Sequence, residues 1–188
     1  EAIQKHRNGI VSLYKNTAKG EDINMRQISV LLTKYSDWIS TLVYYIGGRG
    51  FTHSSIALEE DETTYYSFNY RGFAVETVEK HRRREVKRSL CIQMQVSDEA
   101  YSQIKERIQN IEEHRAEYRY TRVGLLFCIL RLPFHWKRHY FCSQFVAELL
   151  RESGAVKLKN SPCFYLPNQF ASELPSLPAC QAVLYNVV

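Results

Sequence analysis

Several patterns that would assign this 188-residue sequence to a common class are missing from it. Its five cysteines are an odd number with irregular spacing and no CxxC pair, which argues against a disulfide framework and a zinc knot. No apolar run approaches the length needed to span a bilayer, and no signal peptide is visible. There is also no internal repeat and no low-complexity segment. The simplest expectation is a cytoplasmic protein with reduced thiols.

The composition is that of a folded domain. With 45% hydrophobic and 24% charged residues, the chain can bury one sizeable core and does not fit a disordered or fibrous class. The formal net charge of +5 is uneven, because the run HRRREVKR (residues 81–88) holds most of the local excess. We expect this run to be a solvated loop or strand edge, with phosphate or anionic lipid as the alternative partner. Without interleaved aromatic residues or a nucleic-acid motif, no nucleic-acid partner is expected.

The first residues differ from the rest. Residues 1–24 carry one weak helical pattern followed by the polar AKGEDIN, and they are expected to form an appended helix or leader. Residues 25–188 are expected to form the functional domain.

Local patterns in that domain predict an alternation of strands and helices. The expected strands are residues 28–33, 51–58, 63–69, 71–78, 89–96 and 180–188. The expected helices begin at Ser36 or Asp37, at Asp98, within 121–136 where Pro133 must end or kink the helix, at Cys142 and at Pro167. Residues 51–69 are typical of a β-hairpin. The resulting fold class is α+β, with a mostly antiparallel sheet packed against helices.

Cys142 lies where a loop becomes a helix, in HYFCSQFVAELL. A thiol attacks only as the thiolate, and the unpaired N–H groups and dipole of a helix N-terminus stabilise that anion. The same N–H groups can hold the oxyanion of a tetrahedral intermediate. Alternatively, Cys142 is a small buried hydrophobic residue, as many cysteines are. The first interpretation makes Cys142 a candidate nucleophile.

A nucleophilic thiol needs a base, and His53 is the best-placed histidine because a strand can aim its imidazole at a packed helix. The base needs a third group that fixes its tautomer and orientation. Ser67, on the neighbouring strand, is the first choice. Asn69, Glu76 and a backbone carbonyl stay open as alternatives.

The segments FTHSSIAL, YYSFN, HYFCSQFVAELL and YLPNQFASELP together resemble the circularly permuted papain-like hydrolases of the NlpC type, particularly their YiiX-like branch, which is related to the lecithin retinol acyltransferase group. The similarity covers about residues 28–185. In that family the catalytic histidine precedes the cysteine, as it does here. The matched motif positions are Phe51, Thr52, His53, Ser55 and Ile56, then Cys142, Ser143, Gln144, Phe145 and Val146, and finally Pro167, Asn168 and Phe170.

The resemblance implies a permuted papain-like fold and thiol-dependent acyl chemistry. Cys142 would attack an amide, ester or thioester carbonyl, His53 would take and return the proton, and the family's third polar residue falls on Ser67. No metal or organic cofactor is implied. The implied substrates are acyl, peptide or lipid groups, released to water or to another acceptor.

Two further interpretations remain from the sequence. A binding module could keep the same groove without turnover and present it to a peptide or lipid. The apolar stretch GLLFCILRLPFHW (residues 124–136), which precedes the basic KRH, is expected to be core, and lining of an acyl pocket or contact with a membrane surface are the alternatives.

Overall fold

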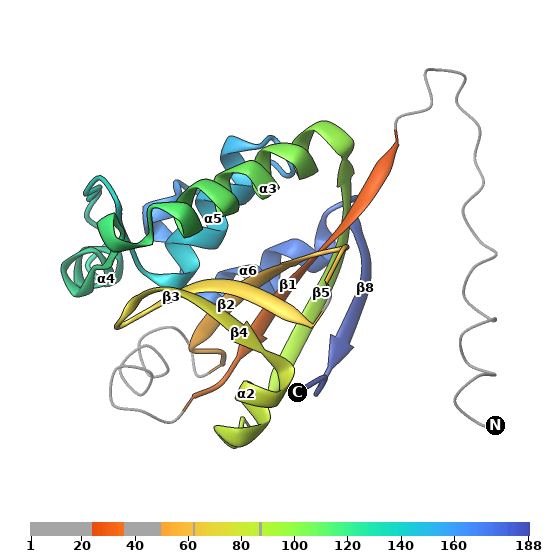
Figure 1. Cartoon of the computed structure of the whole chain (residues 1–188), viewed down its shortest axis with the longest axis horizontal. Coiled ribbons are helices and arrows are strands. Elements are labelled where there is room, and N and C mark those ends of the chain that lie inside the picture. Colours follow the sequence, from red (N-terminus) through yellow and green to blue (C-terminus); the bar gives the residue numbers. More distant parts are fainter. Residues whose placement is uncertain (1–23, 36–49, 62, 87) are drawn as a thin grey trace.

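The computed structural model describes residues 24–35, 50–61, 63–86 and 88–188. Six strands form one antiparallel sheet in the order β4-β3-β2-β1-β5-β8 (Figure 1). The strands are β1 (Met25–Thr33), β2 (His53–Leu58), β3 (Thr64–Asn69), β4 (Gly72–Thr77), β5 (Ser89–Ser97) and β8 (Cys180–Tyr185). All six predicted strands are therefore confirmed, with shifts at their ends. Residues 1–23 of the leader expected at 1–24, and the helix expected to begin at Ser36 or Asp37, lie outside the described residues.

The central strand β1 is buried on both of its faces. β1 is paired on both sides, with β2 and with β5, and Ile28, Val30 and Leu32 are fully buried on one face of it. Because side chains alternate along a strand, Leu31 and Thr33 point to the other face. The nearly continuous apolar run that predicted a buried strand is explained by burial on both faces.

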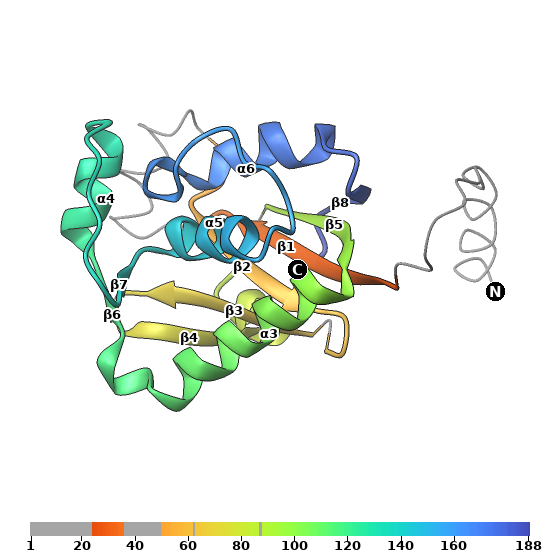
Figure 2. The same cartoon turned by 90° about the horizontal axis from the view of Figure 1, so that it is seen from above.

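Most of the helices lie on the face of the sheet that carries Ile28. The helices are α2 (Val78–Arg83), α3 (Asp98–Glu113), α4 (Arg122–Ile129), α5 (Cys142–Glu152) and α6 (Pro167–Glu173), with 3₁₀ turns at 115–117, 162–164 and 174–176. In Figures 1 and 2, α3, α5 and α6 lie together over one face of the sheet, whereas α2 lies on the other side. The predicted helices at 98, 142 and 167 are confirmed, and Ser97 caps α3 by accepting from the Ala100 N–H. The α+β class is therefore confirmed.

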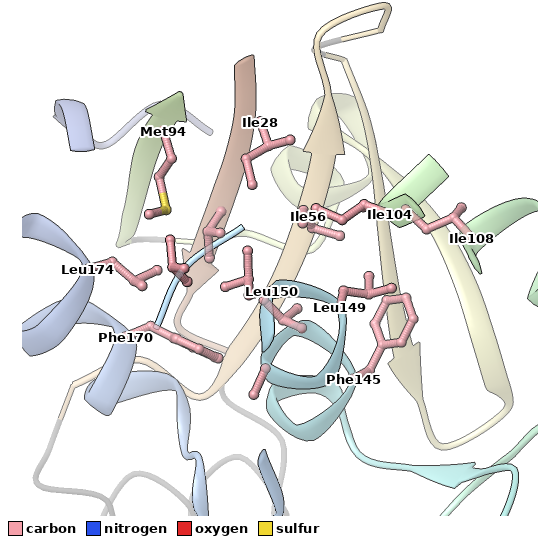
Figure 3. Close-up of a cluster of buried hydrophobic side chains, with 14 of the residues drawn as sticks. Ile28, Ile56, Met94, Ile104, Ile108, Phe145, Leu149, Leu150, Phe170 and Leu174 are labelled. Carbon is pink, nitrogen blue, oxygen red and sulfur yellow. The ribbon is translucent and has the colours of Figure 1, made fainter. Parts of the chain in front are cut away.

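The core joins α5 to the central strands. Phe145, Leu149 and Leu150 of α5 point toward Ile56 of β2 and the helix α3 in Figure 3, and each is at most 3% exposed. Phe145 and Leu149, at i and i+4, lie on one side of the helix, and Leu150 is buried on a neighbouring side because every residue from Cys142 to Leu150 is buried. This packing fixes α5 against β2, and so it fixes the first residue of α5 near the first residue of β2.

The basic run at 81–88 is only in part the loop that the sequence predicted, because residues 81–83 are helical whereas 84–86 and 88 belong to no helix or strand. Its first residues lie in α2, which Thr77 caps by accepting from the Lys80 N–H. His81 is fully buried, whereas Arg82, Arg83 and Arg84 are exposed. The helical period turns His81 toward the sheet and leaves the arginines in solvent.

The apolar stretch at 124–136 is only partly core. Leu125 and Cys128 of α4 are buried against Phe141, but Leu126 and Leu130 are about half exposed. The short parallel strands β6 (Arg119–Tyr120) and β7 (His139–Tyr140) tie the two ends of this stretch together. Within the described part of the chain, no helix has the length and apolarity to cross a membrane.

Candidate active site

Cys142 is the first residue of α5. The residue before it, Phe141, is the N-cap and has no side-chain oxygen that could accept from the first turn, and no side-chain cap is present. The N–H groups of the first turn therefore have no side-chain acceptor at the N-cap. Phe141 packs against Leu125 and Cys128 of α4, which holds the start of α5 in place.

His53 is the first residue of β2, opposite Thr33 of β1. The segment before it is anchored twice. The Thr52 hydroxyl accepts from the Tyr35 N–H at 2.8 Å, and the Phe51 N–H donates to Asn168 Oδ1 at 2.6 Å. Asn168 belongs to the late motif that the sequence singled out, so this motif fixes the strand that carries the histidine.

The Cys142 thiol and the His53 imidazole lie close enough for each to shift the pKa of the other. Both residues are buried, with 9% and 7% of their surfaces exposed. Burial raises the pKa of the Cys142 thiol, but the hydrogen bond and charge of His53, with the backbone N–H groups of Ser54 and Ser143, bring that pKa below its ordinary value. The arrangement favours a thiolate.

The second ring nitrogen of His53 is held by Glu76. His53 Nε2 lies 2.8 Å from Glu76 Oε2 on β4, which leaves Nδ1 as the nitrogen for the thiol. Burial lowers the pKa of His53, but the Glu76 carboxylate and the contacts with Cys142 raise it well above its ordinary value. For the acidic Glu76, burial raises the pKa, but the neighbouring His53 lowers it to about 2. The carboxylate is therefore charged and stabilises an imidazolium.

Ser67, the first choice from the sequence for orienting the imidazole, has another partner. Its hydroxyl donates to the carbonyl of Ser54 at 2.7 Å, so it braces the backbone of β2 one residue beyond His53. Asn69 is also engaged elsewhere, because its Oδ1 accepts from the Arg71 N–H in the turn between β3 and β4. Of the three side chains left open from the sequence, Glu76 is the one that contacts the imidazole.

Two residues behind Glu76, the partly buried Tyr35 and the buried His81, were not singled out from the sequence. The Tyr35 hydroxyl and His81 Nδ1 form a 2.6 Å hydrogen bond, and His81 Nε2 lies 3.9 Å from Glu76 Oε2. Burial lowers the pKa of His81 to about 4, so its ring is neutral at pH 7. A neutral ring that accepts from Tyr35 carries its proton on Nε2, facing the carboxylate. Only the helical phase of 78–83 could have indicated that His81 points inward.

The other candidate side chains lie apart from this cluster. His135 faces Glu148, with Nδ1 and Oε1 3.6 Å apart, and His139 stacks on Trp136. Burial raises the pKa of Cys128 to about 12, which keeps that thiol protonated. Among the described residues, no group of three or more histidine, cysteine or acidic side chains is arranged to hold a metal ion.

The cluster thus brings together a helix N-terminus without a side-chain cap, a thiol, an imidazole and a buried carboxylate. This cluster can generate a nucleophile and supply a proton on the same side of a bound carbonyl. The sequence matches no protein-family model and no curated protein.

Proposed function

We propose that this protein is a thiol-dependent hydrolase or acyltransferase with Cys142 as nucleophile, His53 as acid and base, and Glu76 as the group that orients and charges the imidazole. The observation that carries the proposal is the series Cys142, His53, Glu76, in which the carboxylate holds His53 Nε2 and the imidazole lowers the pKa of the thiol. The antiparallel sheet with a cysteine-bearing helix packed on it fits a permuted papain-like fold of the NlpC type, which is part of the proposal.

The reaction has two halves. The Cys142 thiolate attacks the carbonyl carbon, and the electron pair of the C=O bond moves to oxygen, where the N–H groups at the start of α5 stabilise it. The imidazolium of His53 then gives its proton to the departing amine, alcohol or thiol, and a thioester with Cys142 remains. In the second half, neutral His53 takes a proton from water or another acceptor, which attacks the thioester and releases the thiolate.

The substrate class follows from the nucleophile. A thiolate paired with an imidazolium can open amides, esters and thioesters, and the donated proton is most needed by an amine leaving group. The site therefore supports acyl, peptide or lipid substrates that carry such a carbonyl.

An acylation assay tests the proposal. The full chain is incubated with a panel of acyl thioesters, activated esters and peptide amides, and the adduct is measured by intact mass spectrometry and mapped to a residue. We expect one acyl group per chain on Cys142. His53→Ala should slow acylation by about 10²- to 10⁴-fold, the usual contribution of general acid and base catalysis.

The controls separate this thiol from the others. Cys142→Ala should form no adduct, whereas Cys180→Ser, which removes a partly exposed thiol on β8, should react as the wild type does. Adducts spread over several cysteines, or an adduct that persists in Cys142→Ala, would contradict the proposal. Binding of a panel compound without any acylation would favour the binding module that the sequence left open.

A further inference from the structure

One segment of the surface is both apolar and basic. Five of the large apolar side chains that are exposed in the described part of the chain come from residues 123–136, and this set is called the α4 apolar face. It consists of Val123, Leu126, Leu130, Leu132 and Trp136, which are 46% to 56% exposed. A contiguous exposed apolar set of this kind is unusual for a surface that meets only water.

The geometry of α4 (Arg122–Ile129) separates its two sides. Gly124, Leu125 and Cys128 are buried, and the buried side packs on Phe141, the residue next to Cys142. Val123, Leu126 and Leu130 follow the i, i+3, i+7 spacing and lie on the opposite side. The helix is therefore apolar on both sides, but only one side has a partner within the described structure.

The end of α4 holds the α4 apolar face in a defined shape. The Arg131 N–H donates to the Cys128 carbonyl and the Leu132 N–H to the Phe127 carbonyl, which is the Schellman pattern. Phe127 in turn packs on Phe134, with ring centroids 4.7 Å apart. Leu130 and Leu132 are therefore presented to solvent by an ordered backbone.

The segment that carries the α4 apolar face has charges of one sign, and the neighbouring Glu117 pairs with one of its arginines, Arg138. From residue 118 to residue 147 the sequence has no aspartate or glutamate, and it has five arginines and lysines. The basic residues are Arg119, Arg122, Arg131, Lys137 and Arg138, and all five are exposed.

Two of these arginines occupy backbone positions that favour glycine. Arg131, at the end of α4, has φ of 57°, and Arg138, in the turn before β7, has φ of 61°. An arginine in this conformation is strained relative to glycine. At both positions the backbone would favour glycine, but the side chain present is positively charged.

The position of α4 suits a flat partner better than a groove. In both Figure 1 and Figure 2, α4 lies at one extremity of the ordered fold, at the end of the molecule opposite β8. Leucines with a tryptophan, surrounded by arginine and lysine, are the composition of surfaces that insert shallowly into anionic bilayers.

We propose that the α4 apolar face docks on an anionic lipid membrane, with its leucines and Trp136 in the interface and the surrounding basic residues against the headgroups. Docking through α4 brings Cys142 next to the bilayer, because Phe141 lies between α4 and the thiol. The inference does not depend on the proposed chemistry, and Cys142→Ala should bind vesicles as the wild type does.

Vesicle co-sedimentation of the full chain tests this proposal. Vesicles of phosphatidylcholine with phosphatidylserine should bind the protein, pure phosphatidylcholine should bind it much less, and binding should weaken sharply as salt is raised. Leu126→Glu and Leu130→Glu should each weaken binding by about tenfold or more, because each removes an inserted leucine and adds a negative charge. Arg131→Gly should weaken it by about fivefold, the effect of roughly one basic side chain at an anionic surface.

Matched controls locate the docking site. Leu184→Glu changes a leucine that is 42% exposed on β8, at the other end of the molecule, and should leave binding unchanged. Arg82→Ala with Arg83→Ala removes two exposed charges of α2, on the far side of the sheet, and should cause less loss than Leu126→Glu. Circular dichroism confirms that each variant is folded.

Three results would overturn the proposal. The first is no binding of the folded wild type to phosphatidylserine vesicles at low salt. The second is loss of binding in the α2 double variant with none in Leu126→Glu, which would assign the membrane contact to the basic run at 81–88. The third is a dimer in size-exclusion chromatography that Leu126→Glu dissociates, without vesicle binding, which would show that a second copy covers α4.

Discussion

At the scale of single residues, the charge on Glu76 is the feature on which the site depends most. A fully buried carboxylate is costly unless a positive partner lies within hydrogen-bonding distance, and His53 is that partner at 2.8 Å. The ion pair also stabilises the charge on His53, because the Glu76 carboxylate favours the protonated imidazole. The imidazolium in turn favours the thiolate of Cys142, so the charge on β4 supports the nucleophile on α5.

Glu76→Gln tests this link. The variant keeps an oxygen near the imidazole but removes the charge, and we expect the rate of Cys142 acylation to fall by about 100-fold, within the range that acid and base catalysis contributes. Ser67→Ala is the matched control on the same face of the same hairpin. It removes the hydrogen bond to the Ser54 carbonyl, which should cost about 1 kcal/mol of folding free energy and leave the acylation rate within about threefold. A large loss of rate in Ser67→Ala with none in Glu76→Gln would reverse the two roles.

The sequence identified Cys142 and His53 but could not rank their supporting residues. Glu76 pairs with Tyr65 across the hairpin, and Ser67 is two residues beyond Tyr65, so strand alternation places Glu76 and Ser67 on the same face. What separates them is their partners, because the Ser67 hydroxyl donates to the Ser54 carbonyl and the longer Glu76 side chain reaches His53 Nε2. These contacts depend on how three strands are placed beside one another. A pattern within one strand does not contain that information.

At the scale of secondary-structure elements, α4 and α5 end in the same way with different residues. The residue after the C-cap is left-handed in both helices, Arg131 with φ of 57° and Gly154 with φ of 70°. Glycine adopts this conformation without a steric penalty, whereas a residue with Cβ loses roughly 1–2 kcal/mol. The two helix ends therefore form a natural comparison.

Gly154→Ala and Arg131→Gly should change stability in opposite directions. No atom lies within 4 Å of a Cβ added at Gly154, so only the backbone conformation opposes alanine there. We expect Gly154→Ala to lower the free energy of unfolding by about 1 kcal/mol and Arg131→Gly to leave it unchanged or raise it, as measured by urea denaturation. Equal destabilisation by both substitutions would show that Arg131 makes contacts that outweigh its strain.

Elements with strong local signals were predicted, and elements determined by tertiary contacts were not. Cys142 begins a helix because apolar residues follow it at helical spacing and Gly154 ends it, which are features of the local sequence. The helix that contains His81 was missed, because its basic residues were interpreted as a solvated loop and burial of one side was not visible. In the same way, 124–136 was expected to be core, but its apolar residues exceed what one buried side can hold.

At the scale of the whole molecule, the site exists only because distant segments meet. His53 lies at the start of β2, Glu76 near the end of β4 and Cys142 at the start of α5, and the core around Ile56 and Phe145 joins these elements. The same packing places α4 beside the start of α5 through Phe141. The proposed chemistry and the proposed membrane contact therefore lie in neighbouring parts of the same packed structure, although they are tested separately.

Titration of the Cys142 thiolate tests the central claim most directly. The ultraviolet absorbance of thiolate is followed with pH in the wild type and in Cys142→Ser, and the difference reports Cys142 alone. Because the pKa of Cys142 is lowered and that of His53 is raised, the ion pair should be present between these two pKa values. It should be lost as pH falls through the Cys142 pKa, and the imidazolium should lose its proton as pH rises through the His53 pKa.

We predict that Cys142 titrates below the ordinary thiol pKa of about 8.5 and that His53→Ala moves its titration to higher pH. The account would be contradicted by a Cys142 thiolate that forms only above that ordinary value, or by a titration that His53→Ala leaves in place.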